Sequence, residues 1–136
     1  MQALNDTMFA RPPVYVRRSD LPELWRIAAE ARKMTPEAPL FLEEFDRLSI
    51  AADARQDGFV RLGSRVVYRD LRNKRQRCVR LVRPGAENSD ENEVSLLSPI
   101  GGALVGLAEG SIFRWAASDG HLRAIKVLEV TQDKAK

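Results

Sequence analysis

The sequence predicts an α+β protein in which a short antiparallel helical hairpin precedes an antiparallel sheet crossed by one helix. Apolar residues recur at helical spacing over 21–34 and again after residue 40, and a proline-containing loop separates the two stretches. From Val60 onward the pattern changes to short runs rich in β-branched residues, which alternate with turn residues. A Ser-Pro helix start followed by small residues interrupts these runs once, at 98–106.

The first predicted helix starts at a capping box. Asp20 is placed as the N-cap residue, and Glu23 follows three residues later, where its carboxylate can reach back to the helix start. Apolar side chains at helical spacing then continue to about Met34. Pro36 and Pro39 cannot both lie inside one undistorted helix, so this helix must end before them.

A second helix is expected after the proline-containing loop. Phe41, Phe45, Leu48 and Ala52 follow one another at alternating gaps of four and three residues, which is the spacing of a coiled-coil seam. Two such helices joined by a short loop pack as an antiparallel hairpin. Ahead of both helices, residues 14–16 form a short apolar run that predicts an edge strand or a tether.

Strand-like runs fill most of the remaining chain. Residues 60–71 and 76–82 are rich in β-branched side chains, and the turn residues at 72–74 between them predict a β-hairpin. A polar, acidic loop over 84–92 separates this hairpin from the later elements. Further strands are expected at 94–97, 111–116 and 122–131, with a turn at 118–120 joining the last two.

The single helix among these strands is expected to start at Ser98 and Pro99. Ser98 can accept hydrogen bonds from the first unpaired backbone N–H groups, and Pro99 at the first helical position has no N–H to leave unsatisfied. Gly101 and Gly102 allow another backbone to come close, and Gly106 is suited to end the helix. For the Ser98 hydroxyl, helix capping is favoured over contact with a partner.

Length and composition limit what the chain can be. Its 136 residues fit one domain of ordinary size, and no apolar run approaches the ~20 residues that a bilayer helix needs. Nothing resembles a signal peptide, so we expect a cytoplasmic protein with no membrane partner. One cysteine, Cys78, and one histidine, His121, cannot form a disulfide, an ordinary zinc site or a Cys-His catalytic pair within the chain. The strand-like run around Cys78 favours a buried thiol.

The formal net charge of +3 conceals an uneven distribution. Residues 20–57 contain nine acidic and five basic side chains, whereas residues 59–83 contain nine basic and one acidic. A basic cluster can bind nucleic-acid phosphates. Strand alternation divides the arginines of residues 65–83 between two faces, however, and Tyr68 is the one aromatic side chain in that stretch that could stack on a base. We therefore expect no sequence-specific DNA binding, and favour a solvated face or an acidic protein partner.

Several motifs, taken in order, carry a resemblance to a known family. Residues 62–66 on the first sheet strand, 94–101 before the short helix, 103–106 within it and Gly110 after it resemble the C-terminal domain of the bacterial Gre transcription factors. With a short helical hairpin in front, the chain is similar to the regulator of nucleoside diphosphate kinase family, a shortened relative of the Gre factors. The resemblance covers about residues 14–131 and implies an FKBP-like fold for the sheet.

The family resemblance and the changes in sequence pattern together predict four segments. An N-terminal extension is expected to precede a short helical hairpin, and a Gre C-terminal-like (FKBP-like) domain is expected to precede a short tail. Their bounds are 1–18 for the extension, 19–57 for the hairpin, 58–131 for the FKBP-like domain and 132–136 for the tail.

The resemblance implies a protein that binds RNA polymerase at the rim of its secondary channel. The segment that contacts polymerase in Gre domains corresponds here to Leu97, Ser98, Pro99 and Ile100. Leu97 occupies the position where Gre factors often have an acidic or amide residue. In Gre factors, acidic residues at the hairpin tip help to hold a catalytic magnesium ion, whereas the predicted tip here offers the single carboxylate of Glu37. We therefore expect no metal site, no cofactor and no stimulation of transcript cleavage.

Two alternatives to this function are a prolyl isomerase and a direct regulator of nucleoside diphosphate kinase. FKBP-like folds include prolyl isomerases, but fold alone does not carry function. Those enzymes use an aromatic-lined pocket, and the aromatic residues here are divided between the hairpin and scattered strand positions. No set of nucleophile, base and oxyanion-binding groups is visible, so we expect no catalytic residues and no enzyme activity. The sequence carries no surface signature for the kinase, and a monomer is expected.

Overall fold

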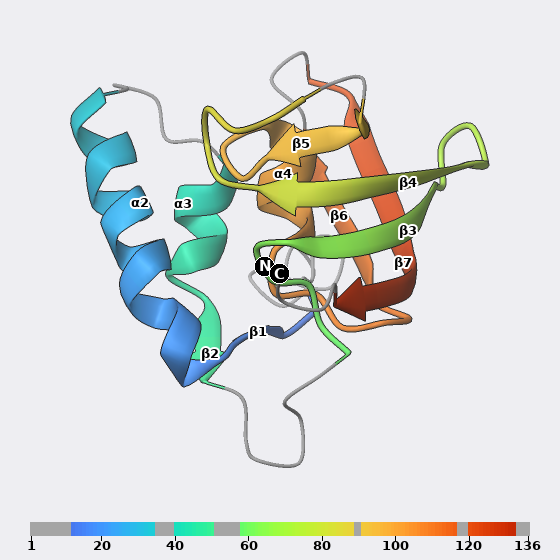
Figure 1. Ribbon diagram of the computed structural model, residues 1–136. Coiled ribbons are helices and arrows are strands. Elements are labelled where there is room, and N and C mark those ends of the chain that lie inside the picture. Colours follow the sequence, from blue (N-terminus) through green and yellow to red (C-terminus); the bar gives the residue numbers. More distant parts are fainter. Residues whose placement is uncertain (1–11, 35–39, 51–57, 89–90, 117–119, 133–136) are drawn as a thin grey trace.

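The computed structural model describes residues 12–34, 40–50, 58–88, 91–116 and 120–132, and it shows two helices beside a curled sheet (Figure 1). The helical part contains a 3-10 turn η1 (Arg18–Asp20), α2 (Leu21–Met34) and α3 (Leu40–Phe45). α2 and α3 are in contact and run in opposite directions, as the predicted hairpin requires (Figure 1). Within the described ranges no helix is long and apolar enough to span a membrane.

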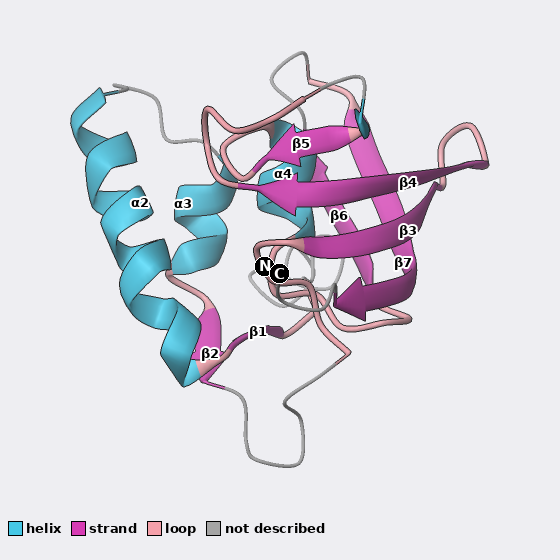
Figure 2. Ribbon diagram, in the orientation of Figure 1, coloured by secondary structure: helices cyan, strands magenta, loops and turns pink. Residues whose placement is uncertain are grey.

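The larger sheet has five strands in the order β5-β4-β3-β7-β6 (Figure 2). β3 is its central strand and pairs antiparallel with both β4 and β7, while β6 pairs antiparallel with β7. The β3–β4 hairpin and the two later strands confirm the predicted strand-like runs. The strand bounds are β3 (Ser64–Asp70), β4 (Arg75–Val82), β5 (Glu93–Ser95), β6 (Ile112–Ala116) and β7 (Leu122–Gln132).

The sheet departs from the prediction at β5, which runs parallel to β4 rather than antiparallel. A tight two-residue hairpin would have forced the antiparallel direction, whereas parallel strands need a longer connection. Residues 83–92 are long enough for that connection, and Gly85 and Asn92 within it have φ angles of +86° and +57°. The acidic loop therefore brings the chain back to start β5 beside β4 in the same direction.

The second predicted helix is wrong beyond Phe45. α3 ends there, and β2 (Leu48–Ile50) pairs in parallel with β1 (Val14–Val16), with Val14 opposite Leu48. Arg47 ends the helix because its backbone N–H bonds to Glu44 O at 2.9 Å and its Nη2 donates to Pro12 O at 2.6 Å. Strand pairing with β1 thus replaces the expected continuation of the coiled-coil seam, and Ala52 lies outside the described residues.

α4 (Pro99–Leu104) is the helix of the sheet part and contacts α3 on one side and β5 on the other. Its residues Gly101 to Leu104 are all buried. Phe41 of α3, Leu104 of α4 and Phe113 of β6 are each fully buried and belong to one apolar core. The helical pair and the sheet therefore share a continuous core, which fixes their relative position.

The prediction of a buried thiol at Cys78 is also wrong, because Cys78 is exposed. Cys78 lies opposite Val67 of β3, and both side chains project from the sheet face opposite to buried Val66 and Val79. Side chains alternate between the two faces of a strand, so a strand-like pattern alone does not say which face is covered. The face that carries Cys78 is open to solvent.

Candidate partner-binding site

Residues 97–100 run from the turn after β5 into the first turn of α4, and hydrogen bonds between the end of β5 and the start of α4 hold them in place. Ser98 Oγ accepts a hydrogen bond from the Gly101 backbone N–H at 3.1 Å and donates to Ser95 O at 2.6 Å. Leu97 N–H in turn donates to Ser95 Oγ at 3.0 Å. The hydroxyl of Ser98 therefore caps α4, as predicted, and Pro99 beside it is exposed.

Leu97 lines a groove between α2 and the segment that follows β4. The groove has a volume of about 480 Å³. Its apolar lining comes from Ile27 and Ala31 of α2, from Pro84 and from Leu97, and its charged lining consists of Glu23, Arg26, Glu30 and Arg83. An acidic or amide side chain at position 97 would place a polar group among these apolar ones, so the groove accounts for a leucine there. Ile100 is half-buried and packs against the core.

Two glycines bring α4 close enough to its neighbours to fix residues 97–100 in place. A Cβ added at Gly101 would lie 1.9 Å from Ser95 O, and one added at Gly102 would lie 2.5 Å from the backbone N of Phe41. Both distances are far below van der Waals contact, so any larger side chain forces the backbones apart. The predicted role of the two glycines in close backbone approach is confirmed.

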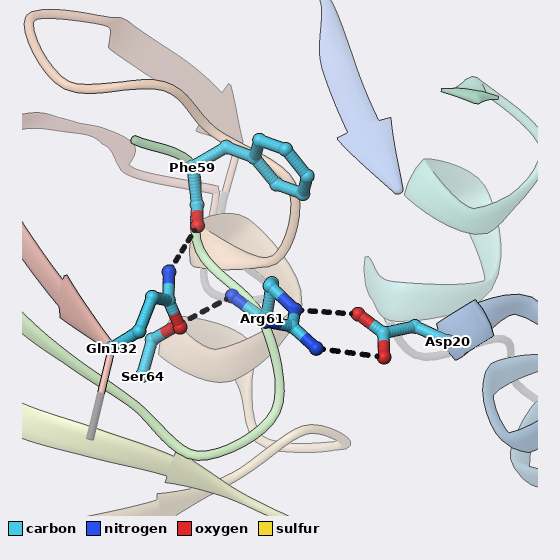
Figure 3. A network of polar contacts seen from close by, with 5 residues as sticks. All are labelled: Asp20, Phe59, Arg61, Ser64 and Gln132. Carbon is cyan, nitrogen blue, oxygen red and sulfur yellow. Dashed lines mark hydrogen bonds and ion pairs between the residues drawn. The ribbon is translucent and has the colours of Figure 1, made fainter. Parts of the chain in front are cut away.

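Two ion pairs join the start of α2 to the sheet part, and sequence reasoning missed both. Arg61 donates from Nε to Asp20 Oδ2 at 2.6 Å and from Nη2 to Asp20 Oδ1 at 3.1 Å, as the dashed lines in Figure 3 show. Arg83 donates from Nε to Glu23, and this bond raises the pKa of the Arg83 guanidinium. The two carboxylates assigned to the capping box thus bind arginines of the sheet part. They border a cavity of about 310 Å³ between α2 and the sheet.

The same polar network extends to the end of β7. Ser64 Oγ accepts from the Arg61 backbone N–H at 2.8 Å and donates to Gln132 Oε1 at 2.6 Å (Figure 3). Gln132 Nε2 then donates to Phe59 O at 2.9 Å. Since Ser64 is buried, these bonds satisfy a hydroxyl that would otherwise be costly to bury. These hydrogen bonds and the Asp20–Arg61 ion pair therefore connect the segment 59–64 to both the end of β7 and the start of α2.

The site as a whole combines an apolar groove, a charged rim and an exposed proline. Leu97 and Ser98 lie directly before α4, and Pro99 and Ile100 are its first two residues. The structure places Leu97 beside α2, which the sequence did not reveal. Glu37, predicted at the hairpin tip, lies outside the described residues. Among the residues that are described, no group of three or more His, Cys, Asp or Glu side chains could hold a metal ion.

The arrangement of a sheet with a helical pair on its flank is shared with a solved structure. A prokaryotic transcription elongation factor GreA/GreB from Nitrosomonas europaea is similar over 89% of this chain and 99% of that one, with a TM-score of 0.65 and 24% identity. This likeness shows a shared fold.

Sequence comparison identifies the family. The family described as "Transcription elongation factor, GreA/GreB, C-term" matches residues 55–132, more than half of the chain, and the protein belongs to that family. Proteins named regulator of nucleoside diphosphate kinase, from Escherichia coli (strain K12) and from Shigella flexneri, are each 29% identical over 96 residues. That match covers 70% of this chain and 71% of each relative.

Proposed function

We propose that this protein regulates transcription by binding RNA polymerase through residues 97–100 and the adjoining groove. The observation that carries the proposal is the position of Leu97, which joins these residues to the apolar groove on α2. The rim of the groove carries two acidic and two basic side chains, so a partner helix with an apolar stripe and mixed flanking charges would fit it. Membership of a transcription elongation factor family supports polymerase as the partner.

The second part of the proposal is that the protein occupies the secondary channel rim without stimulating transcript cleavage and has no enzyme activity of its own. α2 has 14 residues, which corresponds to roughly 21 Å at the helical rise. The resemblance to Gre factors implies a much longer hairpin for the cleavage activity, together with acidic residues at its tip. A hairpin of this length supports occupation of the rim rather than delivery of carboxylates to a distant metal ion.

The test is a binding measurement with purified RNA polymerase core enzyme. Leu97→Glu places a charge among the apolar groups of the groove, and we expect it to weaken binding at least tenfold. Leu122→Glu is the matched control, because Leu122 is an exposed leucine of β7 outside the groove, and it should bind as the unaltered protein does. Equal affinity of both variants would refute the assignment of the site.

Two further measurements separate occupation from catalysis. The protein should displace a longer Gre factor from polymerase at saturating concentration, because both would use the same rim, and failure to do so would contradict the proposal. Added to backtracked elongation complexes, it should leave the rate of transcript cleavage unchanged. Cleavage that is lost in a Glu37→Gln variant would overturn the second part of the proposal.

A second candidate function is direct regulation of nucleoside diphosphate kinase, which is favoured by the names of the two sequence relatives. A transcriptional route would produce an effect on the kinase without any contact. Pull-down with the tagged protein distinguishes the two routes, since retention of polymerase supports the first and retention of the kinase without polymerase supports the second.

A further inference from the structure

One end of the five-stranded sheet carries a concentration of positive charge that the proposed function does not use. The side chains come from the β3–β4 hairpin and from the adjacent strands β6 and β7, and all of them are exposed. We call this region the basic end. Arg69, Arg114 and Lys126 lie on one face of the sheet, Arg75 and Arg77 lie on the other, and Arg72 and Lys74 lie in the turn between β3 and β4.

Strand register explains why cations so far apart in the sequence gather here. Arg69 of β3 lies directly opposite Lys126 of β7, and Arg114 of β6 lies opposite Ala124, two residues from Lys126 on the same strand. Side chains two residues apart on a strand share a face, so Lys126 and Arg114 are diagonal neighbours. Arg72 and Lys74 extend the cluster into the hairpin turn, which projects on the side away from α2 and α3 (Figure 1).

The acidic groups near the basic end leave most of its charge uncompensated. Asp70 is the acidic residue of the hairpin, and its Oδ2 accepts from Arg123 Nη2 at 3.5 Å, so its charge is paired with a cation outside the basic end. Glu129 lies opposite Val67, two residues from Arg69 on β3, so it can offset at most one of the seven cations. Within the described residues, Arg114 and Lys126 have no ion-pair partner. The field of this surface therefore points to an anionic ligand.

The hairpin turn is held in one conformation, which presents its cations in fixed positions. Asp70 Oδ1 accepts from the Arg72 backbone N–H and Asn73 Oδ1 accepts from the Arg75 backbone N–H, both at 2.9 Å. Leu71 N–H donates to Ala124 O at 2.9 Å and so ties the turn to β7. Lys74 has a φ of +63° and bonds through its N–H to Asp70 O. Such preorganisation lowers the entropy lost when an extended anion binds.

From these observations we propose that the basic end binds the phosphodiester backbone of nucleic acid, independently of base sequence. Five of the seven cations are arginines, whose planar guanidinium groups match phosphate oxygens in a bidentate way. The aromatic side chains of β3 and β6, which are Tyr68, Phe113 and Trp115, are buried, so they offer no exposed platform for stacking bases. A protein partner would need buried apolar anchors, and Leu122 is the one large exposed hydrophobic side chain described on this sheet. Backbone phosphates need only cations.

The experiment measures binding to a short fluorescent DNA duplex and to an RNA–DNA hybrid by anisotropy, with no polymerase present. The outcome is therefore independent of the proposed polymerase site. About four phosphate contacts predict an affinity that falls by roughly a hundredfold between about 50 and 200 mM salt. Two double variants remove cations from different elements. One is Arg72→Gln with Lys74→Asn, in which asparagine is chosen because it tolerates the left-handed backbone at position 74. The other is Arg114→Gln with Lys126→Gln.

Each double variant should weaken binding at least tenfold at the lower salt concentration and reduce the slope of log affinity against log salt by about two. The matched control is Arg18→Gln with Lys33→Gln, which removes two exposed cations from the helical part and should leave both quantities unchanged. Unchanged affinity and slope in both test variants would overturn the proposal. Tighter binding to polyglutamate than to a duplex of equal charge would overturn it in favour of an acidic protein partner.

Discussion

The ion pair between Asp20 and Arg61 should stabilise the junction of α2 with the sheet by a measurable coupling energy. The two side chains are 27% and 22% exposed, and they share two hydrogen bonds. Exposed ion pairs contribute about 0.2–1 kcal/mol, whereas hydrogen bonds to charged groups away from solvent contribute about 1.5–3 kcal/mol. The intermediate burial places the coupling of this pair at about 1.5 kcal/mol.

A double-mutant cycle isolates this coupling from the effects of each single substitution. Urea unfolding of Asp20→Asn, Arg61→Gln and the double variant gives the three free energies that are needed. At a typical m-value of about 1.5 kcal/mol per molar urea, the coupling corresponds to roughly 1 M in the unfolding midpoint.

The chain contains its own control for this cycle. Arg32 and Asp46 join α2 to the segment after α3 across 3.3 Å, but their side chains are 49% and 71% exposed. The corresponding cycle with Arg32→Gln and Asp46→Asn should give less than about 0.5 kcal/mol. Equal coupling energies for the two pairs, or a value near zero for Asp20 and Arg61, would refute the view that this pair clamps the helical part to the sheet.

Three further predictions concern single residues. Ser98→Ala removes the cap of α4 and should lower the free energy of unfolding by about 1 kcal/mol in a urea titration, with Ser98→Thr as the conservative control. Gly102→Ala places a Cβ 2.5 Å from the Phe41 backbone and should lower the thermal midpoint, because overpacking of about 1–3 kcal/mol exceeds the gain of about 1 kcal/mol in helix propensity. Burial raises the pKa of Tyr68 above 10.0, so the folded state holds this proton more tightly than the unfolded state. The stabilisation from this protonated hydroxyl is fully present below the unfolded-state pKa and is lost as the pH rises through the folded-state pKa. The urea midpoint should therefore fall less at alkaline pH in Tyr68→Phe than in the unaltered protein.

Local patterns predicted those elements whose stability is decided by neighbouring residues. The Ser98-Pro99 helix start needed only a capping hydroxyl and a residue without an N–H, and both act within one turn. The β3–β4 hairpin was likewise predicted by its β-branched runs and by the turn residues between them.

Elements decided by distant partners were not predicted correctly. The gaps between Phe41, Phe45 and Leu48 suit a helix, but Leu48 pairs instead with Val14, a residue 34 positions earlier, and pairing in the folded chain overrides periodicity. The ion pair of Asp20 with Arg61 spans 41 positions, so the sequence could suggest only the local capping role for Asp20. Within the candidate site, residues 97–100 were predicted and the groove beside Leu97 was not, because its other wall belongs to α2.

The position of β7 in the sheet has a consequence for how the chain folds. β7 lies between β3 and β6, and its residue Gln132 pairs with Ser64 near the start of β3. The central strand therefore gains its second neighbour only through contacts between residues more than 50 positions apart, which gives the sheet a high contact order. During synthesis, β3, β4 and β5 are made before residues 122–132, so the central strand has an unpaired edge until β7 is available. Completion of the sheet is thus a late and slow event.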